Sequence, residues 1–492
     1  PNIVSKVAGD ILREKLPNAD EYMMLPEYNE ILKLLEKGIG IHHAGMLPVF
    51  RELIEKIFKK GFIQLLVATE TFAVGINLPC KCTLFPRLIK WNGDKNRYLE
   101  GHEYIQQAGR AGRRGFDDKG EAYHLVNLFD EMPPSNTYKE ILAGKPQALV
   151  SKFKISFEFV LNIVDTDNDA SIESFANNSM ISEEINKELS YLDKTIQEKK
   201  SLLDTKENSL KFCTTSLELL TEYKEGLEKL AYTKNKKKKA LERSLEMIKD
   251  SNKMFNKDYD LYISIIDLKH EITKLQRQYG YTKDHISYNV EKVHHILTTN
   301  NFIDNENKLT ESGIVAHNIK EIHSLAFANT MKYCNYFENF TSSDIAAYLS
   351  IYSQINVKDD YKKWNPDSTN SYINDIVKFT KERIDNYENE EAKNEIFTGT
   401  CNEINYDIIN FIHRWCQSDD QEDCKRILSD CIYNTNLFVG DFVKAILKIN
   451  NITKEIDRVC DLLGNKVELQ NKIRKIPKLT LKFIATNQSL YI

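Results

Sequence analysis

The sequence predicts a multidomain protein in which an α/β domain with a parallel sheet is followed by mostly α-helical regions. Three observations lead to this fold class. Short apolar strands alternate with helical stretches near the start of the chain, leucines recur every seven residues after position 181, and apolar residues follow helical spacing from about position 320. The length of 492 residues agrees with about three domains.

The α/β domain is predicted from two strands of the buried type. Residues 38–45 form a short apolar strand that ends in a loop of small and polar residues, and residues 65–79 form a strand that runs into a turn containing Thr69, Gly75 and Asn77. A helical stretch or a turn follows each strand. This β-α-β order is typical of a parallel sheet, which binds ligands at the carboxyl ends of its strands.

A third segment, residues 103–115, carries two arginines among glycines. Arg110 and Arg113 stand three residues apart, and Gly109 and Gly112 each precede one of them. Guanidinium groups bind phosphate oxygens bidentately, and glycine lets the backbone turn tightly and approach a ligand. The segment therefore suits a polyphosphate, although taken alone it is equally consistent with a basic surface loop.

In this order and at this spacing, the three segments resemble the second RecA-like lobe of superfamily 2 helicases. The resemblance is specific to the superkiller-type (Ski2-like) DExH-box RNA helicases, which feed the RNA exosome. It implies that Gln106, Arg110 and Arg113 are catalytic, as an arginine-finger motif that contacts ATP across a cleft between two lobes. The other nucleotide-binding residues that it implies are Gly75, Asn77 and Gly109.

The resemblance assigns the first two turns to RNA. The residues that it places along the RNA backbone are His43, Ala44, Gly45, Thr69 and Glu70. The adjacent histidines His42 and His43 raise the question of a metal, but no cysteine or carboxylate follows at the spacing of zinc ligands. We therefore predict no metal site and interpret both histidines as loop residues.

The sequence contains neither a Gly-x-x-x-x-Gly-Lys-Ser/Thr motif nor an Asp-Glu-x-His motif. The phosphate cradle, the Mg²⁺ ligands and the group that positions water are then expected on a first RecA-like lobe, in cis or in trans. We expect the chain alone not to hydrolyse ATP, and we interpret it as the C-terminal part of a longer enzyme or one half of a split one. Residues 2–6 lie where the first strand of the lobe should be, so that strand is expected to be truncated.

Composition favours the cytoplasm or the nucleus, or a virion if the source is viral. Nine cysteines fit free thiols in a reducing compartment, and the absence of a run of about eighteen apolar residues predicts no membrane span. The net charge of -5 gives no global attraction to nucleic acid, so local basic groups must supply it.

Residues 181–278 predict an antiparallel coiled-coil hairpin. Its first helix carries a heptad series, its second begins after the polar segment 232–239, and Lys236–Lys239 mark the tip. In the family, this position holds an arch tipped by a small β-barrel, for which no insertion of sufficient size exists here. The tip lysines fit either RNA phosphates or a solvated turn. The heptad residues are Leu189, Ile196, Leu203, Leu210 and Leu217.

The remaining domains follow from the same resemblance. Residues 1–132 would be the second RecA-like lobe, 133–180 a linker and the start of a winged helix, 279–319 the rest of it, and 320–492 a C-terminal helical domain. Residues 302–303 and 308–316 predict two strands of the winged helix. Asn92-Gly93 predicts a β-hairpin turn. Trp415 and Tyr491 are predicted core residues.

These features predict an ATP-dependent RNA helicase that moves along single-stranded RNA, unwinds duplexes and works in an RNA-decay complex. A DNA helicase of the same superfamily is one alternative, because no residue distinguishes the two nucleic acids. A non-catalytic nucleic-acid-binding adaptor is the other. The joint retention of Asn77, Gln106, Arg110 and Arg113 argues against the adaptor.

Overall fold

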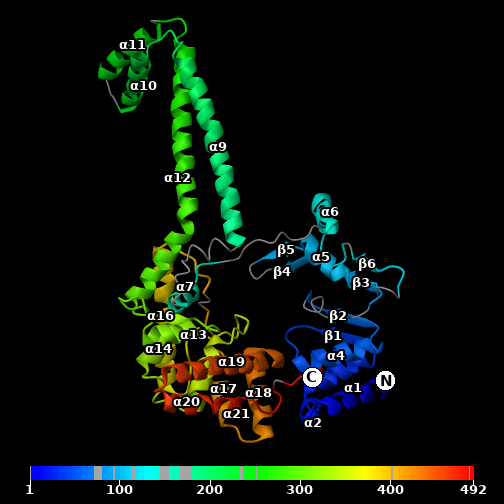
Figure 1. Ribbon diagram of the computed structural model, residues 1–492. Helices are drawn as coiled ribbons and strands as arrows, with labels where there is room; N and C mark the ends of the chain where they lie inside the picture. Colours follow the sequence, from blue (N-terminus) through cyan, green and yellow to red (C-terminus); the bar gives the residue numbers. More distant parts are fainter. Residues whose placement is uncertain are drawn as a thin grey trace. The chain divides into compact units, whose positions relative to one another are not determined.

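The computed structural model describes residues 2–70, 80–91, 95–112, 117–125, 127–144, 154–166, 180–232, 236–250, 252–400, 403–486 and 488–491. They form two compact units (Figure 1). The first comprises Pro1–Leu149, Ser156–Asp165 and Ile296–Ile492, and the second Val150–Ile155 and Thr166–His295.

The first unit contains the predicted parallel strand pair near its start. Three helices, α1 (Asn2–Lys15), α2 (Ala19–Met23) and α3 (Pro26–Leu35), precede β1 (Ile39–His42), and α4 (Pro48–Lys59) connects it to β2 (Leu65–Ala68). The strands pair in parallel with His42 opposite Ala68. Their carboxyl ends therefore lie at one edge.

Residues 2–6, which lie where the first strand of the lobe should be, form no strand and belong to α1. The side chains of Ala8, Ile11 and Leu12 are buried. Their spacing of three to four residues is that of a helix face, whereas a strand would bury alternate residues.

A second group of strands follows. β3 (Cys82–Phe85) pairs in parallel with β6 (Glu121–His124), and β4 (Ile89–Trp91) pairs antiparallel with β5 (Asn96–Tyr98). The antiparallel pair confirms the predicted hairpin, whose turn residues Asn92-Gly93 lie outside the described residues. Helices α5 (Gly101–Ala108) and α6 (Ser135–Ala143) pack beside them, around a core of Phe85, Leu88, Leu99, Tyr104 and Ile141.

The rest of the first unit is helical and confirms the predicted fold class. Among its residues, Trp415 is fully buried and donates its indole N–H to the Thr480 carbonyl at 2.9 Å, as a core residue should. Its elements are α7 (Phe157–Asp165), α13 (Glu311–Asn318), α14 (Ser324–Tyr333), α15 (Ser342–Leu349), η2 (Ser350–Tyr352), α16 (Ser371–Lys393), α17 (Ile409–Gln417), α18 (Gln421–Thr435), α19 (Val439–Leu463), α20 (Val467–Ile473) and α21 (Ile476–Thr480).

Two predictions for this region are wrong. Residues 308–316 do not form a strand: a single bridge joins Ile303 to Leu309, and α13 then begins because the Thr310 hydroxyl accepts a hydrogen bond from the Gly313 N–H at 3.1 Å. This is an N-cap, a signal that overrides the strand pattern. Tyr491 is not a core residue, since 56% of it is exposed.

The described residues of the second unit form four helices where two were predicted: α9 (Met180–Leu210), α10 (Leu217–Tyr232), α11 (Lys236–Asp250) and most of α12 (Phe255–Thr299). α9 and α12 lie side by side (Figure 1), joined by Lys199–Glu271 and Lys269–Glu207 ion pairs of 2.8 and 2.7 Å. The heptad seam ends with α9, so Leu217 does not extend it and is exposed. None of the described helices is both long and apolar enough to cross a membrane.

Candidate functional site

The carboxyl edge of β1 and β2 brings together all five residues that the sequence assigns to RNA. His43, Ala44 and Gly45 follow β1, and Thr69 and Glu70 follow β2. The Thr69 N–H donates to the carbonyl oxygen of His42 at 3.1 Å, which ties the second turn to the first. Ala44, Thr69 and Glu70 are exposed, whereas His43 and Gly45 are half-buried. The two turns therefore lie at one edge, at which Ala44, Thr69 and Glu70 are exposed.

His42 is a buried strand residue, so its interpretation as a loop residue is wrong. Its Nε2 lies 2.9 Å from Oε1 of Glu55 on α4, and both side chains are almost fully buried. Burial alone would raise the pKa of the Glu55 carboxyl, but hydrogen bonds from His42 and Tyr491 lower it below its usual value. The charged carboxylate of Glu55 is thus held next to His42, the residue directly before the first turn.

The N-terminus of α19 covers part of the first turn, which the sequence did not indicate. The ring of Phe438, the N-cap of α19, lies 5.3 Å from the ring of His43, and the Lys444 ammonium donates to the Ala44 carbonyl. A Cβ atom at Gly440 would lie 2.5 Å from the carbonyl oxygen of Met46. Glycine at 440 therefore permits this close approach.

The imidazole of His43 is held in a defined position by these neighbours. Its Nδ1 accepts a hydrogen bond from the Gly45 N–H at 3.2 Å. Burial lowers the pKa of His43, and the adjacent His42 lowers it further. A neutral imidazole at this edge can offer a hydrogen bond to a phosphate or a ribose hydroxyl.

The arginine-rich segment begins at the C-terminal end of α5. Gln106 and Gly109 are exposed and Arg110 is half-buried. Gly109 lies in the turn after α5 with a φ of -64°, which any residue adopts, but a Cβ atom there would lie 2.8 Å from the Ile105 carbonyl oxygen. Gly112, with a φ of +88°, does need glycine. Arg113, Gly75 and Asn77 lie outside the described residues.

The backbone around Arg110 is fixed by its neighbours. Cys80 donates its thiol to the Arg110 carbonyl at 2.8 Å and accepts a hydrogen bond from the Gly112 N–H at 2.9 Å. A Cβ atom at Gly120 would come within 2.1 Å of the Ala111 carbonyl oxygen. The backbone of residues 110–112 thus lies between Cys80 and Gly120 and contacts both.

An ion-pair network that sequence reasoning missed connects α5 with the edge formed by His43, Ala44, Gly45, Thr69 and Glu70. We call this edge the RNA-assigned edge. Glu103 accepts two hydrogen bonds from Arg97, at 2.7 and 2.8 Å, and one from Lys90 at 2.8 Å. Lys90 also pairs with Glu70 at 2.6 Å. These hydrogen bonds lower the pKa of Glu103 to about 2, and those from Arg97 have the largest effect. The sequence signal for it was a basic residue on each strand of the predicted hairpin, Lys90 and Arg97, followed closely by Glu103.

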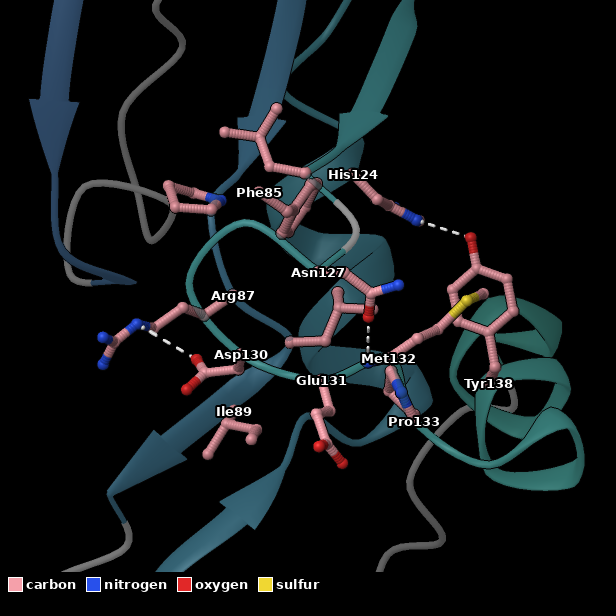
Figure 2. Close-up of a pocket in the computed structure, with 13 residues that line it drawn as sticks. Phe85, Arg87, Ile89, His124, Asn127, Asp130, Glu131, Met132, Pro133 and Tyr138 are labelled. Carbon is pink, nitrogen blue, oxygen red and sulfur yellow. Dashed lines mark hydrogen bonds and ion pairs between the residues drawn. The ribbon is translucent and has the colours of Figure 1, made fainter.

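A small pocket lies where β3 and β6 end, and Figure 2 shows it. Its polar groups pair with one another: Arg87 with Asp130 at 3.1 Å, and His124 with the Tyr138 hydroxyl at 2.7 Å. Its volume of about 20 Å³ holds roughly one water molecule. The pocket is too small for a nucleotide, so it belongs to the packing of this region.

Two domain families match the chain. Residues 17–115 match the helicase conserved C-terminal domain, and residues 306–487 match the DSHCT (NUC185) domain. The first range contains the RNA-assigned edge and the start of the arginine-rich segment. The second contains α19, which packs on that edge.

Three relatives illustrate the similarity. The chain is 43% identical over 145 residues to the DExH-box ATP-dependent RNA helicase DExH10 of Arabidopsis thaliana, 44% identical over 146 residues to the exosome RNA helicase MTR4 of Homo sapiens, and 43% identical over 140 residues to the antiviral helicase SKI2 of Saccharomyces cerevisiae. The matched stretches cover 30, 30 and 28% of this chain, and 14, 14 and 11% of the relatives. The similarity therefore concerns a small part of each relative.

Proposed function

Because the chain belongs to the Ski2- and Mtr4-like DExH-box RNA helicases, with a helicase conserved C-terminal domain and a DSHCT domain, we propose that it is part of an ATP-driven RNA motor. Together with a first RecA-like lobe, it couples ATP hydrolysis to movement along single-stranded RNA and to duplex unwinding. As the names of relatives include an exosome helicase, we place this activity in RNA decay.

The observation that carries the proposal is the shared edge of β1 and β2. Ala44 and Thr69 are exposed and have small side chains, which leave room for a sugar-phosphate chain. Proteins bind such a chain through its backbone without base specificity. The Glu70 carboxylate, which is half-exposed beside Lys90, suits a ribose 2′-hydroxyl rather than a phosphate. This residue favours RNA over DNA as the substrate.

The nucleotide is assigned to the end of α5. Gln106 is exposed there, and Arg110 follows within the same short segment. In the proposed mechanism, Arg110 and Arg113 neutralise charge that spreads over the transferred phosphoryl group. The Mg²⁺ ligands and the phosphate cradle belong to the first lobe, so the chain alone is proposed to be inactive. Glu70, Lys90 and Glu103 connect the nucleotide segment to the RNA edge.

Alanine substitution of Arg113 in the enzyme that includes the first lobe tests this assignment. We expect the ATPase rate to fall by roughly 10³ to 10⁵, the usual contribution of an arginine finger. The same loss is expected for Arg110→Ala. Arg426→Ala is the matched control, because Arg426 lies on α18 with 69% of its side chain exposed. A normal ATPase rate in the Arg113→Ala enzyme would remove the basis of the motor assignment.

A further inference from the structure

Residues 483–486 and 488–491 run from the end of the range that matches the DSHCT domain onto the helicase domain. The Asn18 amide donates to the Phe483 carbonyl at 3.1 Å, and the Tyr22 hydroxyl lies 2.9 Å from that of Thr486. Leu490 is fully buried. The segment is thus packed on the helicase domain rather than loosely attached to it.

Two carboxylates of α4 hold the last part of this segment. Glu52 accepts hydrogen bonds from the Ser489 hydroxyl, at 3.0 and 2.9 Å to its two oxygens, and from the Leu490 N–H. Glu55 accepts a hydrogen bond from the Tyr491 hydroxyl at 2.6 Å. The tyrosine ring is otherwise half-exposed and lies under the Lys56 ammonium, 5.0 Å from the ring centre.

Glu55 connects this contact to the RNA-assigned edge. Its other oxygen lies 2.9 Å from the His42 imidazole, and His42 is the residue directly before the His43–Gly45 turn. The His42 carbonyl in turn receives the Thr69 N–H. A series of hydrogen bonds therefore runs from Tyr491 through Glu55 and His42 to both turns.

We propose that Tyr491 is a positioning residue for RNA binding: its hydroxyl fixes Glu55, Glu55 fixes His42, and His42 sets the geometry of the His43–Gly45 turn. The part of this inference that concerns RNA binding rests on the proposed function. Two contacts then act on the same turn: α19 of the DSHCT domain packs on it, and Tyr491, which follows the matched range, acts through the buried Glu55 and His42.

The substitution Tyr491→Phe removes one hydroxyl and leaves the ring in place. The matched control is Tyr433→Phe, because Tyr433 is 85% exposed on α18. Both variants of the whole chain are compared with the unmodified chain for affinity to a single-stranded oligouridine at several salt concentrations. Without RNA, they are compared for amide hydrogen exchange at residues 43–46 and 69 and for the imidazole nitrogen resonances of His42.

We expect Tyr491→Phe to shift the His42 resonances, to speed exchange in both turns and to weaken RNA binding by about three- to tenfold, since part of a charge-assisted hydrogen bond is lost. The salt slope should stay unchanged because no phosphate contact is removed. The control should change none of these quantities. A merely structural role would lower the unfolding temperature without moving the His42 resonances selectively.

The outcomes separate this inference from the proposed function. Unchanged exchange and an unchanged His42 signal would overturn the positioning role, even if the chain binds RNA. Altered exchange with unchanged RNA affinity would overturn its RNA component. If the unmodified chain binds no RNA, the proposed function fails, and the resonance and exchange data still decide whether Tyr491 positions the turn.

Discussion

At the scale of single residues, Glu103 shows how one side chain organises a site. It lies in the first turn of α5 and binds both strands of the β4–β5 hairpin, through Lys90 and Arg97. Only 12% of its side chain is exposed, so these bonds are shielded from water. Charge-assisted hydrogen bonds in such surroundings are among the strongest in proteins.

Replacing Glu103 by Gln should destabilise the first unit by about 2 kcal/mol, because two cations lose their shared carboxylate. The measurement is chemical unfolding followed as a function of pH. Because the folded pKa of Glu103 is lowered to about 2, its stabilisation is full above the unfolded pKa and is lost as pH falls through the folded one. The difference between the two proteins should therefore shrink below about pH 4.

Glu131→Gln serves as the control, because Glu131 is exposed. It should leave both stability and its pH dependence unchanged. A Glu103→Gln protein whose stability equals that of the unmodified chain at neutral pH would show that the hairpin is held by other contacts.

At the scale of elements, the second unit shows how a heptad pattern ends. Asp258, buried near the start of α12, accepts hydrogen bonds from the Thr215 N–H and hydroxyl at 3.0 and 2.8 Å. This contact fixes the break between α9 and α10, so the chain turns there instead of continuing the seam. The apolar repeat alone could not indicate the break, because Leu217 keeps the spacing.

The lysines at the start of α11 offer a test at the same scale. If Lys236–Lys239 contact RNA phosphates, their joint replacement by Gln should lower RNA affinity and reduce the salt slope by up to about 0.7 per lysine. The measurement is oligouridine binding across a salt series. Replacement of four lysines along α9, Lys187, Lys194, Lys200 and Lys206, changes the net charge equally and is the control.

Equal effects of the two sets would mean that only net charge matters. No effect of either would favour the solvated turn for the tip lysines. A larger effect of the α11 set would support a specific RNA contact at this position.

At the scale of the whole molecule, the first unit joins two domain families through the RNA-assigned edge. Gly440 on α19 lies against the backbone of Met46, where a Cβ atom would come within 2.5 Å of a carbonyl oxygen. Backbone cannot move aside as the end of a side chain can. The contact between the helicase and DSHCT domains therefore depends on a residue without a side chain.

The substitution Gly440→Ala should separate α19 from the turn and lower stability by about 1–3 kcal/mol, the usual cost of overpacking. Thermal unfolding and amide exchange at residues 43–46 measure the two effects. Gly280→Ala is the control, because a Cβ atom at Gly280 meets no atom within 4 Å. Its position within α12 should make that change neutral or stabilising. Unchanged exchange in the Gly440→Ala protein would mean that α19 does not constrain the turn.

Much of the fold could be predicted from local patterns in the sequence. Alternation of strands and helices predicted the parallel pair of β1 and β2, Asn92-Gly93 predicted the hairpin, and the seven-residue repeat predicted α9. The sequence failed where a short-range signal outweighed periodicity: the cap at Thr310 turned a predicted strand into a helix, and Asp258 ended the seam.

By itself, the sequence determined the family, the fold class and the residues that gather at the β1–β2 edge, because these depend on spacing along the chain and on the common end of parallel strands. Only the tertiary structure decided that His42 is buried against Glu55, that Tyr491 binds the same carboxylate, and that α19 covers the first turn. These contacts join residues about 400 positions apart or depend on burial. No local pattern encodes which surfaces meet, because the free energy of such contacts comes from desolvation and complementary geometry between whole domains.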